Sequence, residues 1–293
     1  PGHERAVKGM VALLRQAGDN KRALSVLSGR AAALSGEERH LLLCEIAEGY
    51  EVDADDLGAA ESSYKLVLAE DAKSSDALRG LDRIYSRQSR YSDLLSVLER
   101  EVELAVTARQ KITLLERVAG VWDEEFLDHE KAAAALEQVM ALDPTRADSA
   151  RELARHYRSL EKFVELSQLY QSQIDKSSDD KLRLDSALSL GRLLASELSA
   201  PQRAIEAYEL VLSLEPGHKA ALDALATLRA TAGDSESALD AIEALADAAK
   251  TPKERADYYV RAASLLEQQG DLEASIGQLK RAIDAFPEDG GAR

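Results

Sequence analysis

The sequence predicts an all-α fold built as an array of repeated helix pairs. Its composition is typical of helices, because Ala and Leu dominate and aromatic residues make up only 4% of the 293 residues. One pattern of small, large apolar and aromatic residues also returns along the chain with a period of about 34 residues. A chain of this length is long for one compact core, which favours a repeat array or two domains.

The pattern is clearest in three segments, which begin at Ala60, Ala132 and Ala204. Residues 204–216 read AIEAYELVLSLEP, residues 132–144 read AAAALEQVMALDP, and residues 60–72 follow the same frame with Ala in place of the final Pro. Weaker copies complete a set of eight anchor positions, which are Ala23, Ala60, Leu94, Ala132, Leu166, Ala204, Ala238 and Ser275. Their spacings of 37, 34, 38, 34, 38, 34 and 37 alternate, so two repeats form a double module of about 72 residues.

This period and these residue types resemble the tetratricopeptide repeat. The first helix of a repeat carries large apolar and aromatic residues, as at Leu78, Leu81 and Tyr85, and Gly-Asp pairs mark the turn between the two helices at 18–19, 233–234 and 270–271. The Trp that the family places on its first helix is absent. The resemblance covers nearly the whole chain and implies about eight repeats in a right-handed α-solenoid, a superhelix of antiparallel helix pairs.

The double modules predict four divisions of the chain, at residues 1–72, 73–143, 144–215 and 216–289. Pro1 takes the place that Pro144 and Pro216 hold inside the array, and the chain stops just after Pro287, the next such place. We interpret the chain as a fragment of a longer array, the alternative being a complete protein that pairs end to end. Uncovered end faces would then favour head-to-tail self-association, through Val7, Met10, Val11 and Leu14 at one end and Ile276, Leu279, Ala282 and Ile283 at the other.

Charge and hydropathy narrow the range of partners. The formal net charge of −16 opposes binding to phosphate backbones, so we expect no nucleic-acid partner. Membrane insertion is not expected, because no apolar run approaches the roughly 18 residues that span a bilayer. A cytoplasmic location is favoured, with the alternative that a targeting segment lies outside the fragment.

Sequence motifs of catalysis are missing from the chain. It has no Gly-rich phosphate loop, no HExxH pair and no nucleophile elbow, and its single cysteine, Cys44, excludes a site built from several cysteines. We therefore expect no catalytic residues, no metal site and no cofactor.

Candidate binding residues come from the resemblance, because first helices in this family line the concave face where peptides bind. The family frame places basic residues there at Arg79, Arg83, Arg151 and Arg155, and acidic residues at Glu45, Glu48 and Glu116. One interpretation is that arginine forks bind the acidic groups of a peptide. The favoured interpretation is that neighbouring helices pair their charges with one another. The family's carboxylate clamp is not implied, because no Asn occupies the required positions.

The function predicted from these features is a non-catalytic protein–protein interaction scaffold that binds partner proteins or peptides on its concave face. The alternatives are a regulatory or substrate-docking arm of a larger multidomain enzyme and a structural spacer that stacks end to end. For stability, we expect Tyr208→Ala to be costly because Tyr208 packs between helices. We expect Arg83→Ala to cost little because an exposed charge pair contributes little.

Overall fold

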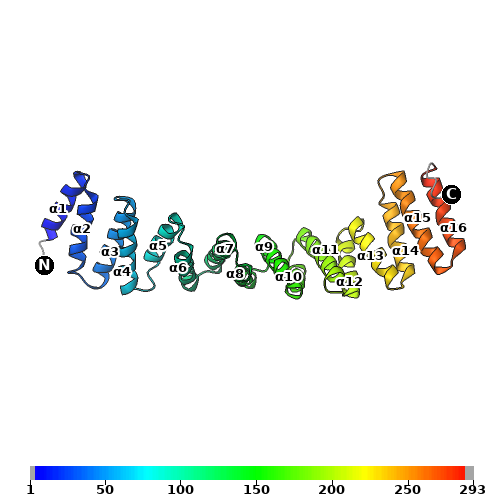
Figure 1. Ribbon diagram of the computed structural model, residues 1–293, viewed down its shortest axis with the longest axis horizontal. Helices are drawn as coiled ribbons and strands as arrows, with labels where there is room; N and C mark the ends of the chain where they lie inside the picture. Colours follow the sequence, from blue (N-terminus) through cyan, green and yellow to red (C-terminus); the bar gives the residue numbers. More distant parts are fainter. Residues whose placement is uncertain (1–3, 288–293) are drawn as a thin grey trace. The chain divides into compact units, whose positions relative to one another are not determined.

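The computed structural model describes residues 4–287, and all of the regular secondary structure in this range is helical (Figure 1). The chain divides into two units, Pro1–Leu142 and Asp143–Arg293. The first unit contains α1 (Glu4–Gln16), α2 (Asn20–Ala31), α3 (Gly36–Val52), α4 (Leu57–Glu70), α5 (Ser75–Arg87), α6 (Tyr91–Leu104), α7 (Ala108–Glu124) and α8 (His129–Leu142). The second contains α9 (Ala147–Ser159), α10 (Phe163–Lys176), α11 (Asp180–Ser196), α12 (Pro201–Leu214), α13 (Lys219–Thr231), α14 (Ser235–Asp247), α15 (Pro252–Gln269) and α16 (Leu272–Ala285).

Each unit is a stack of helix pairs, so the predicted all-α repeat solenoid is confirmed. An odd-numbered helix, here called a first helix, packs against the even-numbered second helix that follows it, and that second helix packs against the next first helix. The division of each unit into double modules stays a prediction. None of the described helices is long and apolar enough to cross a membrane.

Small residues at fixed positions allow the paired helices to approach closely. The Ala side chains at anchors 23, 60, 132, 204 and 238 are fully buried. Gly191 on α11 faces the ring of Tyr208 on α12, and a Cβ atom at Gly191 would lie 2.8 Å from that ring. Gly80 on α5 faces Tyr64 on the preceding α4 in the same way, where a Cβ atom would lie 2.2 Å from the ring. An added methyl group at either glycine would therefore force the helices apart.

The turn inside each helix pair contains one residue in the left-handed backbone conformation. In the outer pairs this residue is glycine, at Gly18, Gly233 and Gly270. In the five central pairs it is a residue with a side chain, at Asp55, Ser89, Leu127, Glu161 and Ser199, with φ between 47° and 55°. These eight positions repeat with the same spacings as the anchors, and each lies two positions before the first residue of the second helix. The turn geometry therefore follows the repeat even where glycine, which adopts it most readily, is absent.

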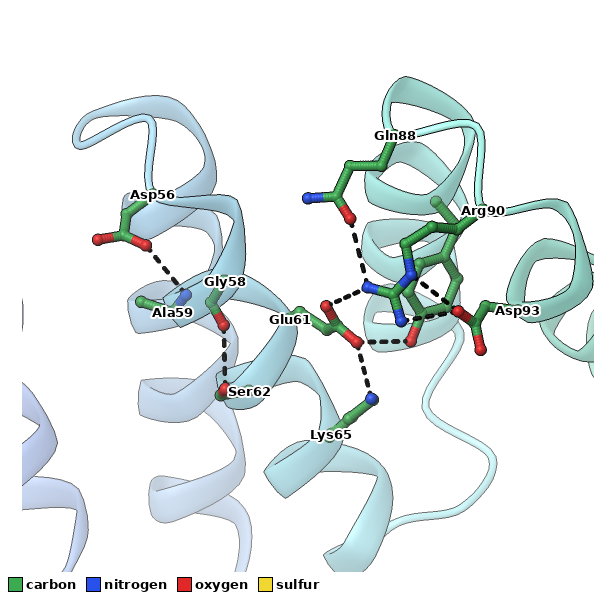
Figure 2. A network of polar contacts seen from close by, with 10 residues as sticks. Asp56, Gly58, Ala59, Glu61, Ser62, Lys65, Gln88, Arg90 and Asp93 are labelled. Atoms are coloured by element: carbon green, nitrogen blue, oxygen red, sulfur yellow. Dashed lines mark hydrogen bonds and ion pairs between the residues drawn. The ribbon is translucent and has the colours of Figure 1, made fainter.

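A polar network joins the second and third helix pairs in the first unit (Figure 2). The Glu61 carboxylate on α4 accepts hydrogen bonds from Arg90 Nη1 at 2.6 Å, Lys65 Nζ at 2.7 Å and Tyr85 Oη at 3.1 Å. Arg90 also bonds Asp93 at 2.8 Å and lies over the Tyr85 ring. These donors, with Arg90 the strongest, lower the pKa of Glu61 to about 2.

Candidate peptide-binding pockets along the first helices

Charged side chains on neighbouring first helices pair with one another. Arg83 on α5 forms a two-bond fork with Glu51 on α3, from Nε to Oε1 at 2.8 Å and from Nη2 to Oε2 at 2.7 Å. Arg117 on α7 forms the same kind of fork with Asp82 on α5, with both bonds at 2.7 Å. Such bidentate pairs fix geometry as well as charge, so they hold successive first helices in register.

Equivalent pairs join other first helices of the array. Arg15 on α1 reaches Glu45 on α3 at 3.5 Å. In the second unit, Lys219 on α13 bonds Glu254 on α15 at 2.6 Å, and Arg261 on α15 bonds Asp223 on α13. Pairing between first helices is therefore a property of both units.

The Glu51 side chain is the most buried member of these pairs. Glu51 is only 6% exposed, and besides the Arg83 fork its carboxylate accepts a bond from Tyr64 Oη at 3.0 Å. The Arg83 guanidinium is the main cause of the lowered pKa of Glu51, and the Tyr64 hydroxyl adds to it against the effect of burial. The expectation that Arg83 belongs to an exposed charge pair was wrong, because its partner is a buried carboxylate that the sequence pattern did not identify.

The other predicted binding residues occupy several environments. Arg79 bonds Asp76 at 2.7 Å, Arg151 bonds Asp148, and Arg155 bonds Glu152 at 3.2 Å, each within its own helix. Their binding role, with that of Arg83, Glu45, Glu48 and Glu116, stays a prediction. In the structure Glu48 is exposed and Glu116 is half-buried.

A pocket of about 440 Å³ opens between α5, α6 and α7 in the first unit. Its walls are mostly apolar, and it is lined among others by Leu78, Leu104, Val106 and Leu114. Polar residues at its surface include Arg79 from α5 and Glu101 from α6.

A second pocket, of about 590 Å³, opens between α9, α10 and α11 in the second unit. It is more polar, and the residues that line it include Arg151, Arg158, Tyr170, Gln173, Lys181 and Asp185. We call the two cavities the α5–α7 pocket and the α9–α11 pocket.

The two pockets are equivalent positions of the repeat. Arg151 lines the second pocket one double module after Arg79 lines the first, and the same offset relates Gln173 to Glu101. Within each unit a pocket is therefore formed by two consecutive first helices and the second helix between them. The repeat fold determines the shape of the pocket. The side chains that differ between the two pockets determine its polarity and charge.

Sequence reasoning missed Glu101 and Gln173, the polar residues contributed by the second helices. Oε2 of Glu101 and Nε2 of Gln173 are both buried and have no hydrogen-bond partner within the described residues. Burial, with a smaller contribution from Asp82, raises the pKa of Glu101. Both residues lie seven positions after an anchor, and the residue at the same offset in the next double module is the buried Leu245. A polar residue at an offset where another copy has a buried leucine is unusual, so comparing the copies at this offset would have identified Glu101 and Gln173.

Comparisons with known proteins identify the repeat. Two family models described as tetratricopeptide repeat match residues 77–112 and 256–289. Among curated proteins, the chain is 27% identical over 201 residues to cellulose synthase operon protein C of Xanthomonas axonopodis pv. citri (strain 306). That alignment covers 68% of this chain and 11% of the relative, so the chain spans about a ninth of the length of that protein.

Solved structures share the fold at low sequence identity. The structure of Naa15/Naa10 bound to HypK-THB is 15% identical with a TM-score of 0.51, over 99% of this chain and 43% of that one. The C-terminal part of a TPR repeat-containing protein from Cytophaga hutchinsonii is 16% identical with a TM-score of 0.45, covering 85% and 97% of the two chains. YrrB, described as a TPR protein with an unusual peptide-binding site, is 20% identical with a TM-score of 0.42, covering 61% and 88%.

Proposed function

We propose that this chain, which belongs to the tetratricopeptide repeat family, binds extended segments of partner proteins along its first helices and carries out no chemistry itself. Tetratricopeptide repeats indicate a protein–protein interaction scaffold. The observation that supports a particular surface is the pair of equivalent pockets, each between two first helices and each lined by side chains of differing charge. An extended peptide that lies across first helices would place its side chains in such pockets.

Charge pairing between first helices supports the same surface. A groove made of separate helices binds a peptide well only when the helices are held in place beforehand, because ordering them on binding costs free energy. The forks from Arg83 to Glu51 and from Arg117 to Asp82 supply that order in the first unit.

Peptide selection with blocked pockets tests the proposal. A library of random peptides is selected on the purified chain, and the enriched peptides are then titrated against Thr113→Trp and Asp185→Trp. These two exposed positions are one double module apart and line the α5–α7 and α9–α11 pockets, so a large ring there fills a pocket without entering the core. We expect at least one of the two variants to lose the peptides, while Leu66→Trp, at a half-exposed position on the second helix α4, retains them. Enriched peptides that bind all three variants equally would place binding elsewhere.

A second candidate function comes from the curated relative. The similarity to cellulose synthase operon protein C favours a scaffold that binds other proteins encoded with a cellulose synthase. Biolayer interferometry of the immobilised chain against each protein of such an operon, from the organism that encodes this chain, tests it directly. Binding that the pocket-blocking variants abolish would support this candidate, and no binding to any of them would contradict it.

A further inference from the structure

The α9–α11 pocket contains a buried hydrogen-bond donor that is not used within the described residues. Gln173 on α10 is only 4% exposed, and its Oε1 accepts a bond from Ser186 Oγ on α11 at 3.0 Å. That bond leaves Nε2 as the free end of the amide, and Nε2 has no partner in the described part of the chain. A buried N–H group without an acceptor is unfavourable, so the pocket is suited to a ligand that brings an acceptor.

Cationic groups outnumber anionic groups around that donor. Arg151, Arg158 and Lys181 line the pocket together with Asp179 and Asp185, so the lining is net positive in a chain whose net charge is strongly negative. The guanidinium of Arg158 is held in place by donating to Tyr170 Oη at 2.7 Å, and the Tyr170 side chain is itself 8% exposed. Arg151 is 77% exposed at the rim, where it bonds within its own helix to Asp148 and to the carbonyl of Ala147.

We infer that the α9–α11 pocket binds the side-chain carboxylate of an Asp or Glu in a partner's extended segment. The carboxylate accepts from Gln173 Nε2 and lies among the cations of Arg151, Arg158 and Lys181. This inference rests on the proposed function and specifies what one pocket selects. The hydrogen-bond donor at the centre of the pocket, Gln173 Nε2, belongs to the second helix α10.

The α5–α7 pocket provides a natural comparison within the same chain. Its residue equivalent to Gln173 is Glu101, whose unpartnered atom is an acceptor, so a carboxylate there would meet a like group. In the fourth double module the equivalent residue is Leu245, which is fully buried and offers no polar atom. The same backbone position therefore carries a donor, an acceptor and an apolar side chain in successive modules, and we expect this position to determine selectivity.

Peptide titrations on Gln173 variants test the inference. The probes are pools of acetylated, amidated hexapeptides with randomised flanks and Glu, Lys or Leu fixed at the third position, measured by fluorescence anisotropy on the whole chain. We expect the wild-type chain to prefer the Glu pool. Gln173→Leu, which copies Leu245, should weaken binding of the Glu pool about tenfold or more, the usual contribution of a hydrogen bond to a charged acceptor. Gln173→Glu, which copies Glu101, gives the lining three anionic and three cationic groups and should remove the preference for the Glu pool.

Three controls make the result specific. Gln171→Leu is the matched change at an exposed position on the same helix, where the glutamine bonds Asp175 and lines neither pocket, and it should leave binding of the Glu pool unchanged. A pool with Leu at the third position and a free C-terminal carboxylate separates side-chain from terminal recognition, and should bind more weakly than the Glu pool. Thermal melts of each variant by circular dichroism confirm that it remains folded. As a direct measure of contact, the side-chain amide resonances of Gln173 in the wild-type chain should shift in NMR spectra when the Glu pool is added.

The outcomes separate this inference from the proposed function. If peptides bind and the pocket-blocking variants abolish their binding, but the Gln173 variants retain the wild-type preference, the inference fails and the proposed function stands. A stronger interaction with the terminal carboxylate than with the Glu pool would likewise overturn it. If no pool and no selected peptide binds the wild-type chain, both fail.

Discussion

At the scale of single residues, Glu61 makes stability depend on pH. Its pKa in the folded chain is lowered to about 2, below the ordinary value of 4.5, mainly by the bond from Arg90. A lowered carboxyl pKa contributes stability that is fully present above about pH 4.5 and is lost as the pH falls toward 2. We expect Glu61→Gln to lower the free energy of unfolding by up to about 3 kcal/mol at pH 7, and by much less near pH 2.

Urea denaturation of both chains between pH 7 and pH 2 measures this difference. Glu206→Gln, at an exposed position on α12, serves as the control and should cost little at any pH. A gap between wild type and Glu61→Gln that stays constant across the range would show that the network in Figure 2 does not stabilise the charged carboxylate.

Two arginines on one helix should differ in their contribution to stability. Arg83→Ala leaves the buried Glu51 carboxylate without its guanidinium, which we expect to cost about 3 kcal/mol. Arg79→Ala removes an exposed pair with Asp76 and should cost at most about 1 kcal/mol. Denaturant melts of the two variants compare them directly. Similar losses, or a larger loss for Arg79→Ala, would contradict the importance of the buried partner.

The candidate site was only partly predictable from the sequence. The repeat frame assigned Arg79 and Arg151 to first helices, and both line pockets. It did not reveal that Glu51 is buried, because an acidic residue near the end of a first helix has no sequence sign of its burial. Nor did it reveal Gln173, since an unpaired amide is a property of the side chains around it, and those come from three helices.

At the scale of elements, the turn inside each helix pair offers a test of backbone strain. Leu127 and Glu161 adopt the left-handed conformation. This conformation is higher in free energy for a residue that has a side chain than it is for glycine. Glycine loses more backbone conformational entropy on folding than leucine or glutamate does, and this loss offsets part of the stability gained by removing the strain. We therefore expect Leu127→Gly and Glu161→Gly each to raise the free energy of unfolding by roughly 0.5–1 kcal/mol.

A comparison of Ser89→Gly with Ser86→Gly provides a matched control within one helix pair, because the same substitution is made at a left-handed and at a helical position. Ser89 has φ of 54°, whereas Ser86 is an exposed residue inside α5, three positions earlier. The first change should stabilise, and the second should destabilise by about 0.5–1 kcal/mol. Thermal melts measure both, and a loss of stability at Ser89 would mean that the left-handed turn is not strained.

The helices themselves were largely predictable from the sequence. Anchors, small residues and Gly-Asp pairs recur in register, so the period of the repeat is visible even where single copies are weak. The turns at Asp55, Ser89, Leu127, Glu161 and Ser199 were less visible, because Ser, Leu and Glu carry no signal for a left-handed conformation and Asp carries a weaker one than glycine. There the geometry is imposed by packing of the two helices that the turn connects.

At the scale of the whole molecule, apolar surface at the two end helix pairs bears on self-association. Of the residues predicted to form uncovered end faces, Met10 on α1 and Ile276 on α16 are each 53% exposed. The prediction was wrong for Val11 and Ala282, which are buried by packing against neighbouring helices. Two different apolar surfaces that complement each other make a heterologous contact between copies of the chain, and such a contact propagates into chains. We expect the apparent mass in light scattering to rise with concentration, and Ile276→Glu to suppress that rise. A constant monomer mass over the whole series would rule out association through these faces, and with it the interpretation as an end-to-end spacer.

The residue that occupies the position of Gln173 in each double module has a consequence for how such an array evolves. By the anchor spacing, the four modules carry Arg30, Glu101, Gln173 and Leu245 there. In the genetic code, a glutamine codon lies a single nucleotide change away from codons for arginine, glutamate and leucine. Gene duplication of a module would therefore copy a complete scaffold, and one point mutation would then give the copy a new preference while its core stayed intact. If this position determines selectivity as we propose, an array of this kind would diversify its recognition faster than its fold.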